Sequence, residues 1–412
     1  MFESLRIGNM GAPREELKLD FEFMNTFPSR ELDNEVPIFL RHRGIQGTLK
    51  ASRVAESGGI EKVKLVLKGY LMNVILKLMD VQDSVSSRYD PDNGDGELFR
   101  FDFPLAKEPW SGPQCEENDE DDSARKYLRT LPSSLNVFGP WCSKAVGQAC
   151  CQAEATVRYE VEATAFRGDT IVSKCTHEVR IYDSPDPHPP PVHLAHFPEE
   201  YHCSQEKRLT RFGTSGSHLT VIASEPRPLE IRSHGDPSMA AFALKFIMRD
   251  CAKPRKLDVR INSLLKAVTF ISANKMDSQP TIKQSKDSPF LAAIPKFGRS
   301  YHRSLHLSHW TRNPASHYDV EWIAHALVWL PITENAMPAP TFFTPFLSRR
   351  YSVSLRLEVK GEGKATIILN VPLQIVYPMD VGSADAPSYE VAMTPPCERS
   401  YEEVEVLPIY VR

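Results

Sequence analysis

The chain has 412 residues, more than a single hydrophobic core usually organises, so we expect two domains. Its content of 41% hydrophobic and 25% charged residues is typical of a folded globular protein and excludes a fully disordered chain. A net charge of −4 gives no overall field that would attract nucleic acid or a membrane, so no nucleic-acid partner is expected.

The sequence also predicts where the protein works. The N-terminus is charged within a few residues and lacks the apolar segment of a signal peptide. The longest apolar stretch, residues 69–79, is too short to cross a bilayer and contains Lys77. The eight cysteines are unevenly spaced and indicate no disulfide framework. We therefore expect a cytoplasmic protein.

Alternating apolar and polar residues first indicate strands in the N-terminal half. The apolar members of two such segments are Val63, Leu65 and Leu67, and then Phe99, Phe101 and Phe103. The first three alternate with Lys62, Lys64 and Lys68, and the second three alternate with Arg100 and Asp102. This period of two is typical of strands with one buried face.

A β-hairpin is predicted for residues 155–182, with its turn at 167–169. The residues expected to point inward are Val157, Tyr159, Val161 and Ala163 in the first arm, and Ile171, Cys175, Val179 and Ile181 in the second. The residues between them in the first arm, Arg158 to Thr164, are expected to face solvent.

A second long hairpin is predicted for residues 351–371, with its turn at 361–363. The inward residues are expected to be Tyr351, Val353, Leu355, Leu357 and Val359, followed by Ala365, Ile367, Leu369 and Val371. Ser352, Ser354, Arg356, Glu358 and Lys360 are expected to face solvent. Helical patterns are few, with 123–131 the best candidate, so the predicted fold class is all-β.

Proline and acidic residues predict the domain boundaries. The segment 183–191 contains five prolines, which cannot donate to a β-ladder, so it is interpreted as a linker. The predicted order is an N-terminal extension (1–14), a lobe (15–183), the linker (184–191), a second lobe (192–378) and a tail (379–412). The tail holds seven acidic residues and two arginines, and we expect it to be disordered when free.

Three clusters suggest metal binding but fit it poorly. His302, His306 and His309 would share a face on a helix, yet their segment has strand character, which would place the first two about 13 Å apart. Residues 90–97 put Gly94 and Asp95 where a calcium loop needs an oxygen ligand and a glycine. Cys142, Cys150 and Cys151 match no common zinc spacing. We predict no metal and no cofactor.

No catalytic motif stands out either. The segment 212–217 lacks the spacing of a nucleophile elbow, and 361–366 lacks a complete phosphate-binding loop. We therefore predict no catalytic residues and a protein that is not an enzyme.

Several segments resemble the arrestin family, in particular its fungal α-arrestin branch of trafficking adaptors. The resemblance is most specific at 157–169 and at 338–376, and it also includes 44–52, 60–70, 97–105 and 257–273. In the closing hairpin the matched positions are Pro340, Phe343, Thr344, Arg350, Tyr351, Leu355, Val371, Pro372 and Leu373. The resemblance implies two immunoglobulin-like β-sandwich lobes joined by a short linker.

The resemblance also implies a function. Family members are adaptors that bind cytosolic segments of membrane transporters or receptors and link them to ubiquitin ligases and endocytic sorting. In the α-arrestin branch, WW domains of a HECT-type ligase grip P-P-x-Y motifs, because a proline segment docks an aromatic groove at low entropic cost. This chain has no intact P-P-x-Y motif. Its tail offers two degenerate candidates, Leu407, Pro408 and Tyr410 in one, and Pro387 and Tyr389 in the other.

The remaining predictions concern a basic segment that could contact lipid, the location of the protein and two alternative functions. Lys296, Arg299 and Arg303, with His302 and Arg312 nearby, suggest weak contact with anionic lipid, although such a run is usually a solvated face. The expected location is cytoplasmic, with peripheral recruitment to the plasma membrane or endosomes. The alternatives are a structural subunit of a retromer-like sorting coat and a β-sandwich protein that binds a ligand, with or without enzymatic activity.

Overall fold

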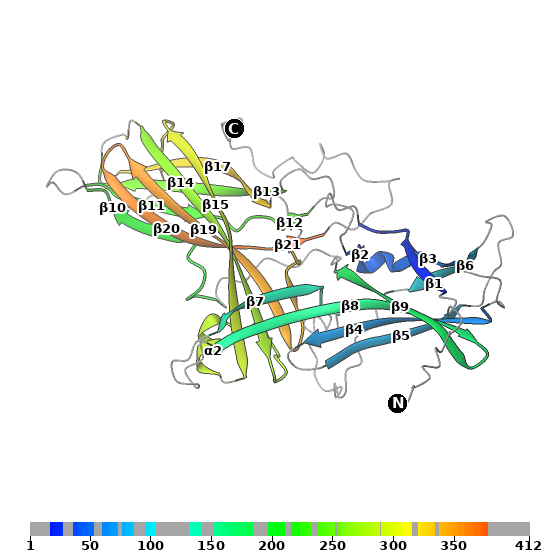
Figure 1. Ribbon diagram of the computed structural model, residues 1–412. Coiled ribbons are helices and arrows are strands. Elements are labelled where there is room, and N and C mark those ends of the chain that lie inside the picture. Colours follow the sequence, from blue (N-terminus) through cyan, green and yellow to red (C-terminus); the bar gives the residue numbers. More distant parts are fainter. Residues whose placement is uncertain are drawn as a thin grey trace, which may run out of the picture. The chain divides into compact units, whose positions relative to one another are not determined.

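In the computed structural model, the described part of the chain is built almost entirely of β-strands (Figure 1). It divides into a first unit, residues 1–107 with 157–181, and a second unit, residues 108–156 with 182–412. The residues that the structure describes are 17–27, 36–52, 60–72, 76–85, 96–103, 105, 132–141, 151–183, 197–210, 216–231, 238–251, 254, 256–288, 290–314, 320–333 and 338–377.

Two sheets belong mainly to the first unit. The smaller sheet has the strand order β1 (Lys18–Phe23), β3 (Ile45–Ser52) and β6 (Gly96–Phe103). The larger sheet has the order β2 (Ile38–Leu40), β9 (Thr170–Tyr182), β8 (Cys151–Arg167), β4 (Lys62–Met72) and β5 (Leu76–Val85), and β7 (Leu135–Trp141) also pairs with β8. A 3-10 turn, Arg41–Arg43, follows β2.

Aromatic side chains join these two sheets into a sandwich. The ring of Phe23 on β1 lies 5.4 Å from that of Phe39 on β2 and 5.2 Å from that of His177 on β9, measured between centroids. Phe99 and Phe103 on β6 are fully buried beside them. Such a double layer with interdigitated side chains is the arrangement that alternation in every strand predicts.

The second unit also contains two large sheets. One has the order β15 (Leu291–Leu307), β14 (Leu257–Ser272), β19 (Leu347–Lys360) and β18 (Phe342–Phe343), and β20 (Lys364–Leu373) also pairs with β19. The other has the order β10 (Ser204–Arg208), β11 (His218–Ala223), β13 (Ser238–Arg249), β17 (Glu321–Thr333) and β16 (Thr311–Arg312).

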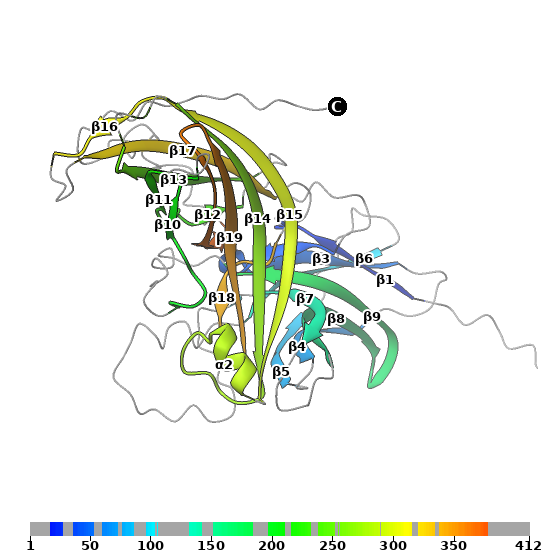
Figure 2. The same ribbon diagram turned by 90° about the vertical axis from the view of Figure 1, so that its left-hand side faces the viewer.

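Two short elements complete the second unit. The strands β12 (Leu229–Glu230) and β21 (Ile375–Val376) pair in parallel. The helix α2 (Ile282–Asp287) follows β14, and Figure 2 shows it beside one end of the long β14 and β15 pair. In the same view β13 and β17 lie beneath the curved upper part of those strands. Within the described ranges no helix has both the length and the hydropathy needed to span a membrane.

The fold-class prediction is confirmed: the described chain is all-β, with sheets layered as sandwiches. In the two predicted hairpins, β8 pairs with β9 and β19 pairs with β20, both antiparallel. Gly168 adopts a φ of +55° in the first turn, a conformation that glycine accepts without steric cost. The predicted helix 123–131, the extension 1–14, the linker 184–191 and the tail 379–412 lie outside the described residues. The predicted lobe boundaries stay a prediction.

Three inward or outward assignments in the hairpins were wrong. Ile171 was expected to be buried but is 59% exposed, because a β-bulge after Ala165 shifts the register and places Ile171 opposite Phe166 on the outer face. Thr164 and Ser352 were expected to face solvent, yet both are buried. At Ser352 the reason is a second layer that covers the outer face of β19.

Candidate functional site

The first half of β19, Leu347 to Ser352, is buried on both of its faces. One face continues the core of the second unit. On the other face Ser348, Arg350 and Ser352 would meet solvent in an ordinary two-layer sandwich, but all three are buried. Residues 197–201 and α2 lie over this face, as the contacts of Arg350 described below show.

Local interactions hold this cover in place. His202 and Asn370 on β20 exchange two backbone hydrogen bonds of 3.0 Å, which fix residues 197–203 against the sheet. The helix α2 begins with a capping box in which the Thr281 side chain accepts from the Gln284 backbone and Gln284 bonds back to Thr281. A short helix therefore starts at a defined residue although it has few turns of its own.

An ion pair between Arg350 and Glu200 lies at the centre of the covered face. Arg350 Nη2 is 2.9 Å from Glu200 Oε2, and the two side chains are only 4% and 9% exposed. Arg350 also donates to the Pro280 carbonyl at 2.7 Å, and Glu200 Oε1 accepts from the Ile282 backbone N–H at 2.6 Å. Each partner thus makes one further hydrogen bond beyond the ion pair itself, which helps a buried pair to offset its desolvation.

Aromatic rings provide the rest of the environment of Arg350. Its guanidinium carbon lies 4.2 Å from the centroid of Phe197 and 4.8 Å from that of Phe270, within the range of cation–π attraction. Arg350 Nε and Nη1 are buried and have no hydrogen-bond partner among the described residues. The guanidinium is therefore packed near two rings, and its two hydrogen bonds among the described residues both come from Nη2.

A second buried arginine occupies the core-facing side of the same strand. Arg349 donates to the Tyr351 hydroxyl and to the Thr269 hydroxyl, each at 2.6 Å. The Tyr351 hydroxyl in turn donates to the Ala339 carbonyl. Burial raises the pKa of Tyr351, so its hydroxyl keeps the proton that this chain of bonds requires.

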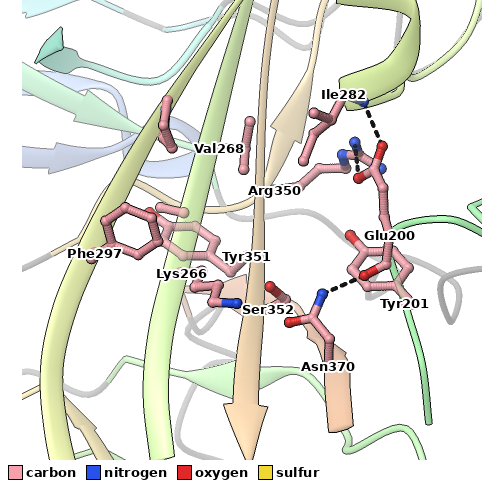
Figure 3. A pocket seen from close by; sticks show the side chains of 12 residues that line it. Glu200, Tyr201, Lys266, Val268, Ile282, Phe297, Arg350, Tyr351, Ser352 and Asn370 are labelled. Atoms are coloured by element: carbon pink, nitrogen blue, oxygen red, sulfur yellow. Dashed lines mark hydrogen bonds and ion pairs between the residues drawn. The ribbon is translucent and has the colours of Figure 1, made fainter. Parts of the chain in front are cut away.

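A pocket of about 230 Å³ opens beside the Arg350–Glu200 pair (Figure 3). The outer face of the sheet contributes Lys266 and Val268 from β14, Phe297 from β15, Ser352 from β19 and Asn370 from β20. Glu200, Tyr201 and Ile282 line it from the covering layer. Asn370 Nδ2 donates to the Glu200 carbonyl, so the amide ties the two layers together at the pocket wall.

The titratable groups near the pocket are held in their protonated or paired states. Burial raises the pKa of Tyr201 to about 12 and that of Cys203 to about 11. A thiol with such a pKa is almost wholly protonated at neutral pH and is a weak nucleophile. Within the described part of the chain, no group of three or more histidines, cysteines or acidic residues could hold a metal ion.

The residues predicted from the sequence lie elsewhere. Lys296, Arg299 and Arg303 all lie on β15, with Lys296 and Arg299 exposed and Arg303 half-buried. Lys296 and Arg303 stand opposite Ala267 and Ile261, so they share the core-side face of this edge strand, whereas Phe297 faces the pocket. A bulge at Gly298 and Arg299 lies between Lys296 and Arg303 along the strand. Both tail motifs lie outside the described residues.

The histidines and cysteines considered as metal ligands also lie away from the pocket or outside the described residues. His302 and His306 share the outer face of β15, opposite Asn262 and Asp258, and His309 lies beyond the end of the strand. The calcium-like segment 90–97, apart from the backbone of its last residues, and Cys142 and Cys150 lie outside the described residues, and the side chain of Cys151 is not described.

Sequence reasoning missed Glu200, Lys266 and Asn370, and it assigned Arg350 only to the resemblance. One signal was available: Arg349 and Arg350 are adjacent in a strand, so they must point to opposite faces. Since one of these faces is core, a buried arginine was predictable. Its partner was not, because Glu200 lies 150 residues away along the chain.

Comparison with known proteins finds structural likenesses but no match by sequence. No protein-family model matches the sequence. No curated protein matches it either. The crystal structure of squid arrestin is similar over 89% of this chain and 99% of that chain, with 10% sequence identity and a TM-score of 0.28. A TM-score this low carries no weight for the assignment, so the all-β architecture rests on the strand registers given above.

Proposed function

We propose that this chain is a non-enzymatic adaptor that binds cytosolic segments of membrane transporters or receptors and links them to ubiquitination and endocytic sorting. The segments that resemble α-arrestins, 157–169 and 338–376, suggest the adaptor role. The layered all-β architecture of the described chain is compatible with it.

The observation that best supports a role in binding, rather than catalysis, is that the titratable groups around the pocket are already hydrogen-bonded or kept protonated. Both carboxylate oxygens of Glu200 are bonded, one to Arg350 and one to the Ile282 backbone. The raised pKa values of Tyr201 and Cys203 keep these two groups protonated at neutral pH. Groups committed in this way hold a surface in shape, and they are poorly suited to transfer protons or attack a substrate.

Affinity capture tests the adaptor role directly. The intact chain and a version cut after Pro378 are each used to capture partners from a cell extract. We expect membrane transporters or receptors with both baits, and a WW-domain HECT ligase with the intact chain alone. Capture of neither class by either bait would contradict the proposal.

The ligase contact is proposed to involve the tail. In both candidate motifs a tyrosine follows a proline, as WW grooves require, and the motif of Leu407, Pro408 and Tyr410 keeps an apolar residue in the first slot. Two motifs on one chain would add affinity through effective concentration. A peptide of residues 379–412 is titrated against WW domains of a HECT ligase. Saturable binding that Tyr410→Ala abolishes would support the contact, and no binding at high micromolar peptide would refute it.

The membrane contact is a separate proposal. Lys296, Arg299 and Arg303 would meet anionic headgroups weakly, and their attraction would fall as salt screens it. Sedimentation with phosphatidylserine vesicles at low and physiological salt measures the contact. Charge reversal at these three positions should abolish it, and binding that survives the reversal would reject this segment.

A second candidate is a structural subunit of a retromer-like sorting coat. The observation that favours it is the lack of an intact P-P-x-Y motif in the sequence. A stoichiometric complex that stays together through purification, and that contains no ligase, would decide for this role.

A further inference from the structure

The pocket beside Glu200 combines an apolar lining with one cation, Lys266, that has no partner among the described residues. Val268, Ile282 and Phe297 supply apolar surface, and Phe297 is 60% exposed at the pocket's edge. Lys266 is half-buried, and no hydrogen bond or ion pair joins it to another described residue. Figure 3 shows its side chain extending toward Ser352 and Asn370.

The charge of the lining does not balance. Lys266 and Arg350 are positive and Glu200 is negative, and these are the three charged residues of the lining, so the sum is +1. Glu200 is committed to Arg350 at 2.9 Å. The cross-strand neighbours of Lys266 are Ser352 on β19 and Phe297 on β15, and neither carries a charge. A single negative charge would therefore balance the lining.

The surroundings of Lys266 also favour a carboxylate over a phosphate as the anion. A half-buried ammonium gains more from an anion than an exposed one, because less water competes for it. Phosphate would bring up to two charges and needs several donors. Arg350 uses its Nη2 for Glu200 and the Pro280 carbonyl, and its Nε and Nη1, although they have no partner among the described residues, are buried out of a ligand's reach. A carboxylate carries one charge, and its apolar body would cover Phe297 and Val268. The volume of about 230 Å³ lies below the roughly 300–1,000 Å³ of pockets for drug-sized ligands.

We propose that this pocket binds a small apolar carboxylate, a short alkyl or aryl carboxylic acid in its ionised form. The carboxylate pairs with the Lys266 ammonium, with the Ser352 hydroxyl close by, and the hydrocarbon part packs against Phe297 and Val268. The ligand would touch both the sheet and Tyr201 of the covering layer, so its binding would stabilise the second unit. This site is independent of the proposed adaptor role.

Octanoate and benzoate are the probes, and octanamide and benzamide are their neutral counterparts. Binding to the full-length chain is followed by saturation-transfer NMR and by the shift of the thermal transition. We expect saturable binding of at least one carboxylate and none of its amide at the same concentration. Equal binding of a carboxylate and its amide would overturn the role of Lys266 even if no variant were available. No saturable binding of either carboxylate up to about 10 mM, the range of the weakest specific ligands, would overturn the site.

Variants sharpen the result. Lys266→Met keeps most of the apolar stem and removes the charge, and we expect at least about a tenfold loss of carboxylate affinity. Lys360→Met is the matched control, because Lys360 lies on the outer face at the other end of the same sheet. Phe297→Ala should weaken binding severalfold with little effect on folding, since this ring is largely exposed. Unchanged affinity in Lys266→Met, or displacement of octanoate by equimolar inorganic phosphate, would refute a carboxylate site.

Discussion

The outer face of the β14–β15–β19 sheet is exposed to solvent at one end and covered by a second layer at the other, although the same strands form both ends. At the open end Asp258, Arg356 and Lys360 are exposed, and the strands alternate between core and solvent. At the covered end Arg350 and Ser352 occupy the equivalent face and are buried beneath residues 197–201 and α2. The same strand period thus gives solvent-facing residues at one end and a second buried layer at the other.

The two ends also differ in how far their ion pairs are buried. Arg350 and Glu200 form a pair that is almost completely buried and that has further hydrogen bonds. At the open end Asp258 and His306 are 2.6 Å apart, but both are more than half exposed. Because water screens the second pair and not the first, the same substitution should have very different costs at the two ends.

The largest effect is expected from a charge in the core below the open end. Leu355 is 1% exposed, and Leu355→Asp should unfold the second unit, since it removes a packed side chain and buries a charge without a partner, at a cost of several kcal/mol. The next residue is the control: Arg356 is 56% exposed, and Arg356→Asp should change the stability by less than about 1 kcal/mol. Denaturant unfolding measures both, and equal tolerance of the two would refute the register of β19.

The next largest effect is expected from breaking the buried pair at the covered end. Glu200→Gln leaves Arg350 buried with no anion beside it, and we expect a loss of about 3–5 kcal/mol in the free energy of unfolding. Replacing both residues with methionine should cost less than the sum of the two single replacements, because no unpaired charge then remains. Arg356→Gln, on the same face at the open end, should cost about 0.5 kcal/mol or less. Additive single and double variants would show that the pair is not coupled.

A smaller effect is expected at the core-facing side of the covered end. Tyr351→Phe removes the hydroxyl that accepts from Arg349 and donates to the Ala339 carbonyl, which leaves two buried groups unsatisfied. We expect a loss of about 1–3 kcal/mol. Tyr377→Phe is a useful control. Its ring is also buried, but its hydroxyl donates at 2.8 Å to the carbonyl of Pro338, which is only half-buried, so the change should cost less. The reverse order of the two costs would contradict a network centred on Tyr351.

The two ends also differ in how far the sequence predicts them. Alternation correctly assigned Leu355 and Leu357 to the core, because at the open end one face meets solvent over its whole length. It misplaced Ser352, because the layer over that residue comes from a distant part of the chain that a local period does not encode. Ile171 was misplaced for another reason: a single extra residue at a bulge reverses every side chain beyond it.

The candidate site was less predictable than the fold for the same reason. Lys266 lies in the segment 257–273, which resembles the arrestin family, but nothing in the residues around it distinguishes it from other solvated lysines. Its position becomes notable only when β14 is paired with Ser352 on one side and Phe297 on the other. Chemistry that depends on cross-strand neighbours requires the register, whereas the all-β class requires only the period.

The smallest effect is expected from the exposed pair at the open end. The hydrogen bond from His306 lowers the pKa of Asp258, and nearby Lys256 adds to it. A carboxyl with a lowered pKa stabilises the fold above its unfolded value of about 3.9, and this contribution disappears as the pH falls through the lower folded value. Because the Asp258 side chain is more than half exposed, Asp258→Asn should alter the stability far less than Glu200→Gln. Carbon-detected NMR titration should find the Asp258 pKa below its ordinary value, and His306→Gln should raise it. An ordinary pKa in the unaltered protein, or a cost that rivals that of Glu200→Gln, would mean that the two ends do not differ in solvent screening as their exposure indicates.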